Sequence, residues 1–239
     1  MEVIIDIGNT RTKIGVFINR GIHQVERLDK GIDKIVSFLK ELEYEKSIIS
    51  STIPLSDADK LALSVSGTPL FLDHYTALPI TNTYSTPETL GRDRLAAVVG
   101  GQFLYPNQNV LAIDAGTCIT YDLIDRDGNY LGGNISPGLE LRARAMDEFT
   151  GALPLVSDFG PQALLGTTTE SAMTSGIVNG FIHEVNGVIE SYSLAYPDLK
   201  IVLCGGQARY LVNHINYEIF ANQNLVLLGL HKILLHNDR

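Results

Sequence analysis

Two short stretches of the chain combine a carboxylate with a glycine in a way that suits phosphate binding. The stretches DIGNTRTK and DAGTCIT place Asp6 two residues before Gly8 and Asp114 two residues before Gly116. Successive N–H groups in a tight turn can converge on an anion, and a nearby carboxylate can hold hydrated Mg²⁺ against phosphates. Each stretch alone also fits an inert polar turn, because turns use the same residue types. Their repetition favours a pair of phosphate-binding hairpins.

Further donors and a glycine pair extend this pattern. Thr10, Thr12 and Lys13 add hydroxyl and ammonium groups to the first hairpin, and we expect positive φ at Gly8. Gly205 and Gly206 follow the apolar run KIVLC and precede a helix start. Such a pair lets a flat ligand such as adenine approach the backbone closely. A plain strand-to-helix turn is the alternative for the glycine pair alone.

Composition narrows the class of protein. The chain has 239 residues, is 45% hydrophobic and carries a formal net charge of −9, which argues against nucleic acid as a partner. Cys118 and Cys204 lie far apart within apolar segments, so we expect reduced, buried thiols rather than a disulfide. The chain shows neither a secretion signal nor an uninterrupted membrane-spanning tract, so we expect a cytoplasmic protein without a membrane partner.

The elements that would position these residues occur twice. Apolar patterning predicts the order β-β-β-α-β-α-β over the first 75 residues, then a polar loop over 75–90 and a helix over 91–103. The second half predicts strands within 109–125, 130–135 and 200–204, and helices over 139–148, 168–195, 207–212 and 222–235. The polar loop is expected to carry Tyr84 to the surface.

This duplication predicts an α/β fold made of two similar domains, 1–105 and 106–239. Each domain would have a β-β-β-α-β-α core and present one Asp-x-Gly hairpin, and the two would face a central cleft. Two opposed hairpins and the glycine pair would clamp a nucleotide.

The ordered set of motifs resembles the superfamily of acetate and sugar kinases, heat-shock chaperones and actin. This resemblance implies that both domains are ribonuclease H-like, as in the actin-like ATPases. Within that superfamily, DIGNT, GRDR at 91–94, DAGTCIT, GGNISPG at 132–138 and TESAMTSG at 169–176 resemble the type III pantothenate kinase family. The resemblance covers essentially the whole chain. It implies ATP-dependent phosphorylation of pantothenate, the first step toward coenzyme A, with Mg²⁺ and a monovalent cation, K⁺ or NH₄⁺. It also implies a homodimer.

The resemblance assigns roles to individual residues. Nucleotide contacts would come from Asp6, Ile7, Gly8, Asn9, Thr10, Arg11, Thr12, Lys13, Thr117, Gly205 and Gly206. Pantothenate contacts would come from Tyr84, Gly91, Arg92, Asp93, Arg94 and Thr169, with Thr169 completing the site across the dimer. Asp114 would bind the monovalent cation, and Asp6 would lie near Mg²⁺ through the phosphates.

Asp93 matches the catalytic proton acceptor. A carboxylate in the first turn of a helix is also favoured by the helix dipole without any catalytic role. Because phosphoryl transfer has a loose transition state, positioning matters more than basicity, and an ionised Asp93 aligned on the hydroxyl would suffice. Likewise, without the resemblance Arg94 would be a surface helix residue, Thr169 a helix N-terminal hydroxyl and Tyr84 a loop aromatic.

We therefore expect a pantothenate kinase that converts pantothenate to 4′-phosphopantothenate. Another small-molecule kinase of the same superfamily is one alternative, and it should lack the set of Tyr84, GRDR and Thr169. A non-catalytic ATP-binding regulator is the other, and it should lack a carboxylate at position 93.

Overall fold

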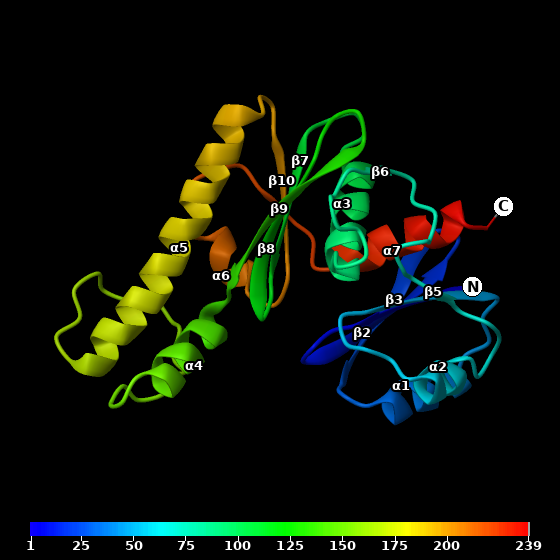
Figure 1. Ribbon diagram of the computed structural model, residues 1–239, viewed down its shortest axis with the longest axis horizontal. Coiled ribbons are helices and arrows are strands. Elements are labelled where there is room, and N and C mark those ends of the chain that lie inside the picture. Colours follow the sequence, from blue (N-terminus) through cyan, green and yellow to red (C-terminus); the bar gives the residue numbers. More distant parts are fainter. Residues whose placement is uncertain (239) are drawn as a thin grey trace. The chain divides into compact units, whose positions relative to one another are not determined.

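The structure is a computed structural model that describes residues 1–238, and it divides into two compact units. Unit 1 contains Met1–Asn107, Ile124–Gly132 and the chain from Asn224 on. Unit 2 contains Gln108–Leu123 and Gly133–Gln223. Figure 1 labels the helices and strands of both units.

Unit 1 is built on a five-stranded sheet with the order β3-β2-β1-β4-β5. Its strands are β1 (Glu2–Ile7), β2 (Arg11–Ile18), β3 (Gly21–Asp29), β4 (Lys46–Ser51) and β5 (Leu70–Phe71). β1 pairs antiparallel with β2 and parallel with β4. Helices α1 (Ile32–Lys40) and α2 (Asp57–Leu63) lie on one side of this sheet, and α3 (Arg92–Leu104) and α7 (Leu225–His236) lie on the other (Figure 1).

The second sheet has the order β11-β10-β7-β8-β9-β6. Its strands are β6 (Thr81–Asn82), β7 (Val110–Ala115), β8 (Cys118–Ile124), β9 (Asn129–Pro137), β10 (Lys200–Cys204) and β11 (Phe220–Ala221). Its helices are α4 (Leu139–Phe149), α5 (Thr169–Ala195) and α6 (Ala208–Val212). Apart from β6, the strand order repeats that of the first sheet, which confirms the predicted duplication.

Hydrophobic patterning explains both cores. Val3, Ile4 and Ile5 of β1 are fully buried, as expected for a central strand covered on both faces. In unit 2, Phe181, Val185 and Ile189 recur at helical spacing on α5 and are fully buried against the sheet.

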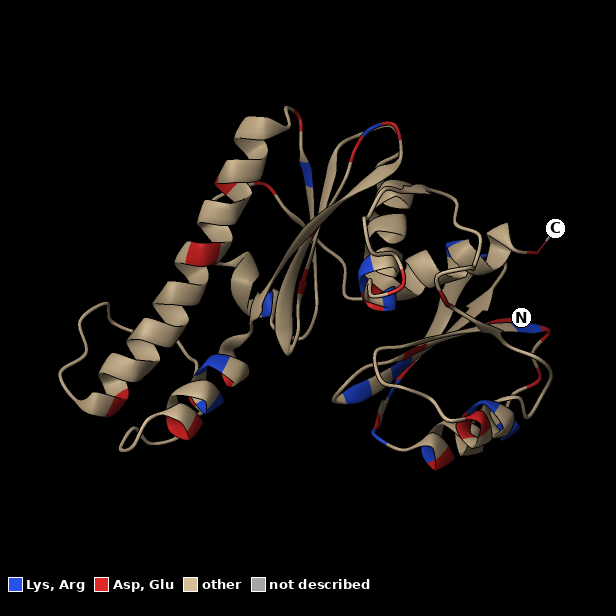
Figure 2. Ribbon diagram, in the orientation of Figure 1, with Lys and Arg blue, Asp and Glu red and all other residues tan. Residues whose placement is uncertain are grey.

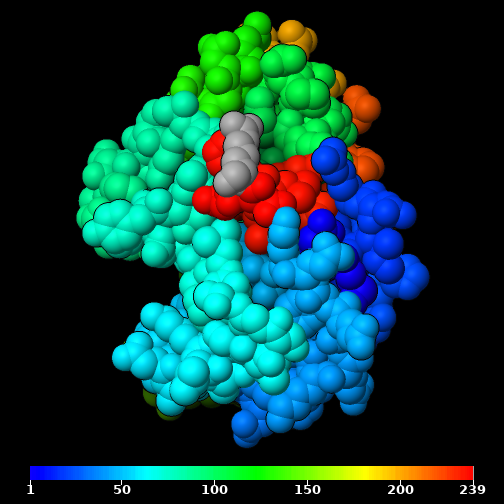
Figure 3. Space-filling model, turned by 90° about the vertical axis from the view of Figure 1, so that its right-hand side faces the viewer, coloured from blue at the N-terminus to red at the C-terminus, as the bar shows by residue number. Residues whose placement is uncertain are grey.

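The last helix belongs to the core of unit 1. α7 packs against α3 and against β1 and β4. Figure 3 shows α7 in red between the blue N-terminal strands and the cyan segment that follows β5. There the Asn237 side-chain amide donates to the Ala77 carbonyl oxygen at 2.9 Å.

Three local predictions are wrong. Tyr84 is half-buried rather than carried to the surface, because it stacks on a neighbouring aromatic ring. Cys118 is partly exposed, because β8 begins at the rim of a turn, whereas Cys204 is buried, and neither cysteine forms a disulfide. Gly8 does not adopt positive φ. Within residues 1–238, no helix is long and apolar enough to cross a membrane.

Candidate active site

The first hairpin joins β1 to β2 and is closed by Gly8. The Gly8 N–H donates to the Arg11 carbonyl oxygen at 3.0 Å, and Asp6 lies opposite Lys13 in the strand register. A Cβ atom at Gly8 would approach the Arg11 carbonyl oxygen to 3.0 Å, so the turn requires glycine for space rather than for positive φ. Asn9, Thr10 and Arg11 are exposed at its tip. The tip therefore offers polar groups to an anionic ligand.

Two residues of the predicted nucleotide set point into the core. Ile7 and Thr12 face each other in the register and are only 3% and 2% exposed. Their side chains pack inside unit 1, so they can reach a nucleotide only through their backbone atoms.

The second hairpin joins β7 to β8 and has a shorter loop. The Gly116 N–H donates to the Cys118 carbonyl oxygen at 2.9 Å, and Asp114 is paired with Cys204 in the register between β7 and β10. The structure therefore places the glycine pair that follows Cys204 beside this hairpin, as the nucleotide clamp requires.

Gly205 is the point of closest approach. It has φ +93°, and a Cβ atom there would lie 2.4 Å from Asp114 Oδ1 and 2.5 Å from the Ala115 carbonyl oxygen. Gly206 has open space around its Cα. Asp114, the hairpin and the glycine pair thus form one cluster within unit 2, with oxygen atoms suited to a hard cation.

The predicted substrate motif is assembled within unit 1 around Tyr84. The Tyr84 ring stacks on Tyr130 with 5.9 Å between centroids, and the Arg94 guanidinium lies over it at 5.6 Å. The Asn82 side chain accepts a hydrogen bond from the Tyr84 N–H at 3.0 Å. Arg94 is only 5% exposed, so it is not the surface residue of the alternative interpretation. A cation against an aromatic face holds both side chains in place.

Asp93 lies in the first turn of α3, which begins after Gly91. Its Oδ1 accepts a hydrogen bond from the Arg94 N–H at 2.9 Å. A Cβ atom at Gly91 would lie 2.6 Å from that oxygen, so glycine here leaves room for the carboxylate. Arg92 donates to the Leu90 carbonyl oxygen and braces the same turn. The residues of the motif GRDR thus hold the Asp93 carboxylate in one orientation.

Thr169 begins α5 in unit 2, but it does not cap the helix. Thr168 is the N-cap residue, because its hydroxyl accepts from the Ser171 N–H at 3.1 Å in a capping box. Thr169 is exposed.

The carboxylates fit Mg²⁺ only together with a phosphate ligand. The part of the chain that the structure describes has no group of three or more His, Cys, Asp or Glu side chains that could hold a metal ion. Mg²⁺ in kinases is usually bound through one or two carboxylates plus phosphates and water, and a single Asp6 at the rim of the first hairpin turn would fit that requirement.

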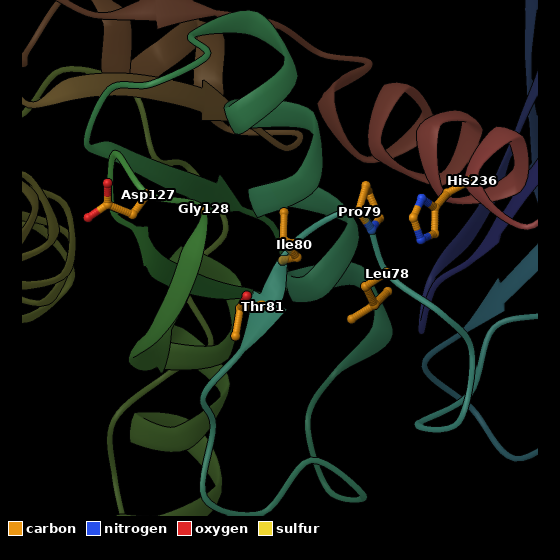
Figure 4. Close-up of a pocket in the computed structure, with 7 residues that line it drawn as sticks. All are labelled: Leu78, Pro79, Ile80, Thr81, Asp127, Gly128 and His236. Carbon is orange, nitrogen blue, oxygen red and sulfur yellow. The ribbon is translucent and has the colours of Figure 1, made fainter.

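A surface hollow in unit 1 is lined by none of the predicted site residues. It has a volume of about 300 Å³ and is lined by residues 78–81, 127, 128 and 236. Figure 4 shows the His236 ring beside Pro79, whereas the Asp127 carboxylate points away from both. The polar groups do not converge, so this hollow has no organised binding site.

Comparison with known proteins identifies the family. The profile of type III pantothenate kinases matches residues 2–191, most of the chain. The chain belongs to the type III pantothenate kinase family. The type III pantothenate kinase of Christiangramia forsetii is 43% identical over 245 residues, and the alignment covers 99% of each chain.

Solved structures place this family member in the actin-like ATPase fold of the sugar kinases, as predicted. A chain described as a Baf family transcriptional activator from Campylobacter jejuni has a TM-score of 0.65 at 21% identity, covering 99% of this chain and 98% of that one. A chain described as an N-acetylmannosamine kinase from Listeria monocytogenes has a TM-score of 0.58 at 13% identity, covering 100% and 99%. At these identities the likeness shows the fold alone.

Sequence reasoning missed the partners of Tyr84 in this type III pantothenate kinase family member. Tyr130 and Asn82 come from β9 and β6, and Gly132 has φ +113° with its Cα facing the Tyr84 ring. The motif GGNISPG, which contains Gly132, was the only sequence signal for these contacts. It does not indicate that Gly132 would lie against the Tyr84 ring.

Proposed function

We propose that this chain transfers the γ-phosphoryl group of ATP to the primary hydroxyl of pantothenate, giving 4′-phosphopantothenate and ADP. The observation that carries this is the family match over residues 2–191. Kinases of this kind use ATP with a divalent metal ion, here Mg²⁺. The fixed orientation of the Asp93 carboxylate supports its role as the catalytic proton acceptor.

In the proposed reaction, the hydroxyl oxygen of pantothenate forms a bond to the γ-phosphorus as the bond between that phosphorus and the ADP oxygen breaks. The hydroxyl proton passes to the Asp93 carboxylate. Because the transition state is loose, the proton leaves late and Asp93 acts mainly by aligning the nucleophile. Tyr84, Gly91, Arg92 and Arg94 would form the pantothenate site around it.

The two hairpins and the glycine pair would hold ATP. Residues 6–13 and Thr117 would contact the phosphates, and Gly205 and Gly206 the adenosine. Asp6 would hold Mg²⁺ through the phosphates, where the metal ion neutralises charge that develops on them. Asp114, beside the oxygen-rich backbone at Gly205, would bind K⁺ or NH₄⁺.

We propose a homodimer that uses the exposed side of α5. This helix contains no Lys or Arg and is largely free of charged residues (Figure 2). Gly176, Gly180 and Gly187 have open space at their Cα atoms, so a second backbone could approach closely. A hollow of about 520 Å³ lies along α5, and Leu194 is 81% exposed at its end. Exposed apolar surface of this kind is typical of an interface.

Dimerisation would give Thr169 its role, because the first turn of α5 from one copy would complete the pantothenate site of the other. We further propose a cytoplasmic protein with two ribonuclease H-like domains that span 1–105 and 106–239 in the sequence, with α7 of the second packed in the core of unit 1. Its main partners would be pantothenate and ATP rather than nucleic acid or membrane. The net charge of −9 supports the exclusion of nucleic acid.

A coupled assay of ADP release tests the activity. ADP release from ATP and Mg²⁺ should depend on added pantothenate and should be faster in K⁺ than in Na⁺. If ADP release does not depend on pantothenate in either salt, the proposed activity is wrong, and another small-molecule kinase or a non-catalytic regulator would remain. Activity that is indifferent to the cation would remove only the role of Asp114.

A further inference from the structure

A polar cluster outside the proposed nucleotide and pantothenate sites connects four elements of unit 2, and its Glu184 also lines the hollow along α5. Its members are Tyr121 of β8, Ser136 of β9, Arg142 of α4 and Glu184 of α5. Glu184 is its centre. The Tyr121 hydroxyl donates to Glu184 Oε1 at 3.1 Å, the Ser136 hydroxyl donates to Oε2 at 3.1 Å, and Arg142 forms an ion pair with the same Oε2.

The cluster is sheltered and its donors are fixed. Tyr121 is fully buried, and the side chains of Arg142 and Glu184 are only 21% and 25% exposed. Burial first, and then the charge of Glu184, raise the pKa of Tyr121 far above its usual range, so its hydroxyl remains a donor at every working pH.

Arg142 connects the cluster to the end of β9 by hydrogen bonds. Its Nε donates to the Pro137 carbonyl oxygen at 2.8 Å, and its Nη2 donates to Ser136 Oγ at 3.2 Å. Its guanidinium also lies over the Phe181 ring at 5.4 Å. The guanidinium is held by the Phe181 ring on its face and by hydrogen bonds from Nε and Nη2 at its edges. It therefore has little conformational freedom and fixes the backbone at Pro137.

The next residue is in direct contact with the second hairpin. The Gly138 N–H donates to the Thr117 carbonyl oxygen at 3.0 Å. A Cβ atom at Gly138 would lie 2.5 Å from the Gly116 carbonyl oxygen and 2.7 Å from that of Thr117. The end of β9 therefore supports the Gly116–Thr117 turn from behind with no intervening side chain.

We infer that Glu184 and Arg142 are positioning residues that hold the Gly116–Thr117 turn in the conformation that receives the phosphates of ATP. The chain of contacts runs from Glu184 to Arg142, from Arg142 to Pro137, and from Gly138 to Thr117. The inference rests on the proposed function for the nucleotide-binding role of the turn. A binding site keeps its productive geometry only if the residues around it hold the binding groups in place. Loss of this support should therefore weaken nucleotide binding.

Glu184→Gln tests this by removing the charge while keeping an oxygen for Tyr121. Its dissociation constant for a non-hydrolysable ATP analogue with Mg²⁺, measured by calorimetry without pantothenate, should rise about tenfold. The KM for ATP should rise in parallel, and the KM for pantothenate should stay unchanged. Glu190→Gln, an exposed acid on the same helix, and Arg144→Lys, an exposed cation on α4, are the matched controls.

Arg142→Lys should give the same split, because a single ammonium nitrogen lacks the planar fork by which Arg142 bonds Pro137 through Nε and Glu184 through Nη2. If Glu184→Gln lowers the melting temperature sharply, Ser136→Ala provides a milder variant with the same expected direction. An unchanged nucleotide dissociation constant in folded Glu184→Gln, with or without altered self-association, would overturn the inference. So would an equal rise in both KM values. If the unaltered protein binds nucleotide without phosphorylating pantothenate, the proposed function fails while the binding comparison still decides this inference.

Discussion

Gly229 of α7 lies directly against the Ala96 backbone of α3. A Cβ atom at Gly229 would be 1.7 Å from the Ala96 carbonyl oxygen, and one at Gly100 would be 2.4 Å from the Leu225 carbonyl oxygen. The two helices therefore approach each other through reciprocal glycines, backbone against backbone. Such an approach allows no side chain between them.

Gly229→Ala should destabilise the protein by about 3 kcal/mol or more, because neither backbone can move without disturbing the core. For a chain of this size that corresponds to a fall of about 6 °C or more in melting temperature. Gly151→Ala, at an exposed glycine with open space, is the control and should leave the melting temperature unchanged. A Gly229→Ala protein as stable as the control would contradict the packing described.

Asp93→Asn should fold normally and bind ATP, yet lose turnover by at least about a hundredfold, because the amide cannot accept the hydroxyl proton. Steady-state kinetics and nucleotide titration measure the two effects separately. Asp33→Asn alters the equivalent first-turn acid of α1 and should retain activity. Near-normal turnover in Asp93→Asn would remove Asp93 from the mechanism.

Asp114→Asn should abolish the stimulation by K⁺, because a neutral amide neutralises the cation less well than a carboxylate. Turnover measured in K⁺ should fall to the level that the unaltered protein shows in Na⁺. Asp127→Asn, in an exposed turn of unit 1, should keep the difference between the two salts. Retention of K⁺ stimulation in Asp114→Asn would place the cation elsewhere.

Leu194→Glu should prevent dimerisation, since a buried unpaired carboxylate at an interface is costly. Sedimentation velocity should show a monomer, and activity should fall because Thr169 would no longer reach a partner's site. Leu61→Glu changes an equally exposed leucine of α2, at 78% exposure against 81%, and should leave a dimer. A dimeric, active Leu194→Glu protein would exclude this side of α5.

His231 should make stability depend on pH. It is fully buried, stacked on Phe17 at 4.1 Å, and burial followed by the charges of Lys232 and Arg20 lowers its pKa to about 4. The Glu2 carboxylate 3.7 Å away favours the protonated form, but burial and the two cations outweigh it.

The folded-state pKa of His231 lies below the ordinary value near 6.5, so the unfolded chain binds the proton more tightly. The free energy of unfolding is therefore highest above about pH 6.5, and it falls by about 3 kcal/mol by pH 4. Urea unfolding between pH 7 and 4 should show this loss, and His231→Leu should reduce the slope by about one proton. His23→Gln, at an exposed histidine of β3, should not. An unaltered slope in His231→Leu would show that other groups dominate acid unfolding.

Much of the fold could be predicted from local patterns of apolar residues. The apolar run of β1 predicts a central strand because both of its faces are buried. The spacing of Phe181, Val185 and Ile189 on α5 predicts a helix because burial of one helical face imposes a period of about 3.6 residues. The repetition of Asp6 and Gly8 at Asp114 and Gly116 predicted the duplicated sheet because a repeated sequence pattern indicates a repeated structural unit.

Contacts between distant segments could not be predicted in this way. Tyr84 is half-buried because Tyr130, from another strand, supplies its stacking surface. The space that Gly8 needs depends on where the Arg11 carbonyl oxygen lies, and the approach of Gly229 to Ala96 depends on a helix crossing. Such requirements belong to pairs of segments, and no single window of sequence contains them.

The placement of α7 affects the order in which the chain can fold during synthesis. Unit 1 begins at residue 1, yet the face of its sheet that α3 covers in part is completed only when residues 225–236 arrive. Until then, the apolar surfaces of β1, β4 and α3 that α7 covers remain open to solvent or to chaperones. The ribosome must therefore synthesise all of unit 2 before unit 1, which contains Asp93, can finish folding. An active enzyme then forms only after translation has passed α7.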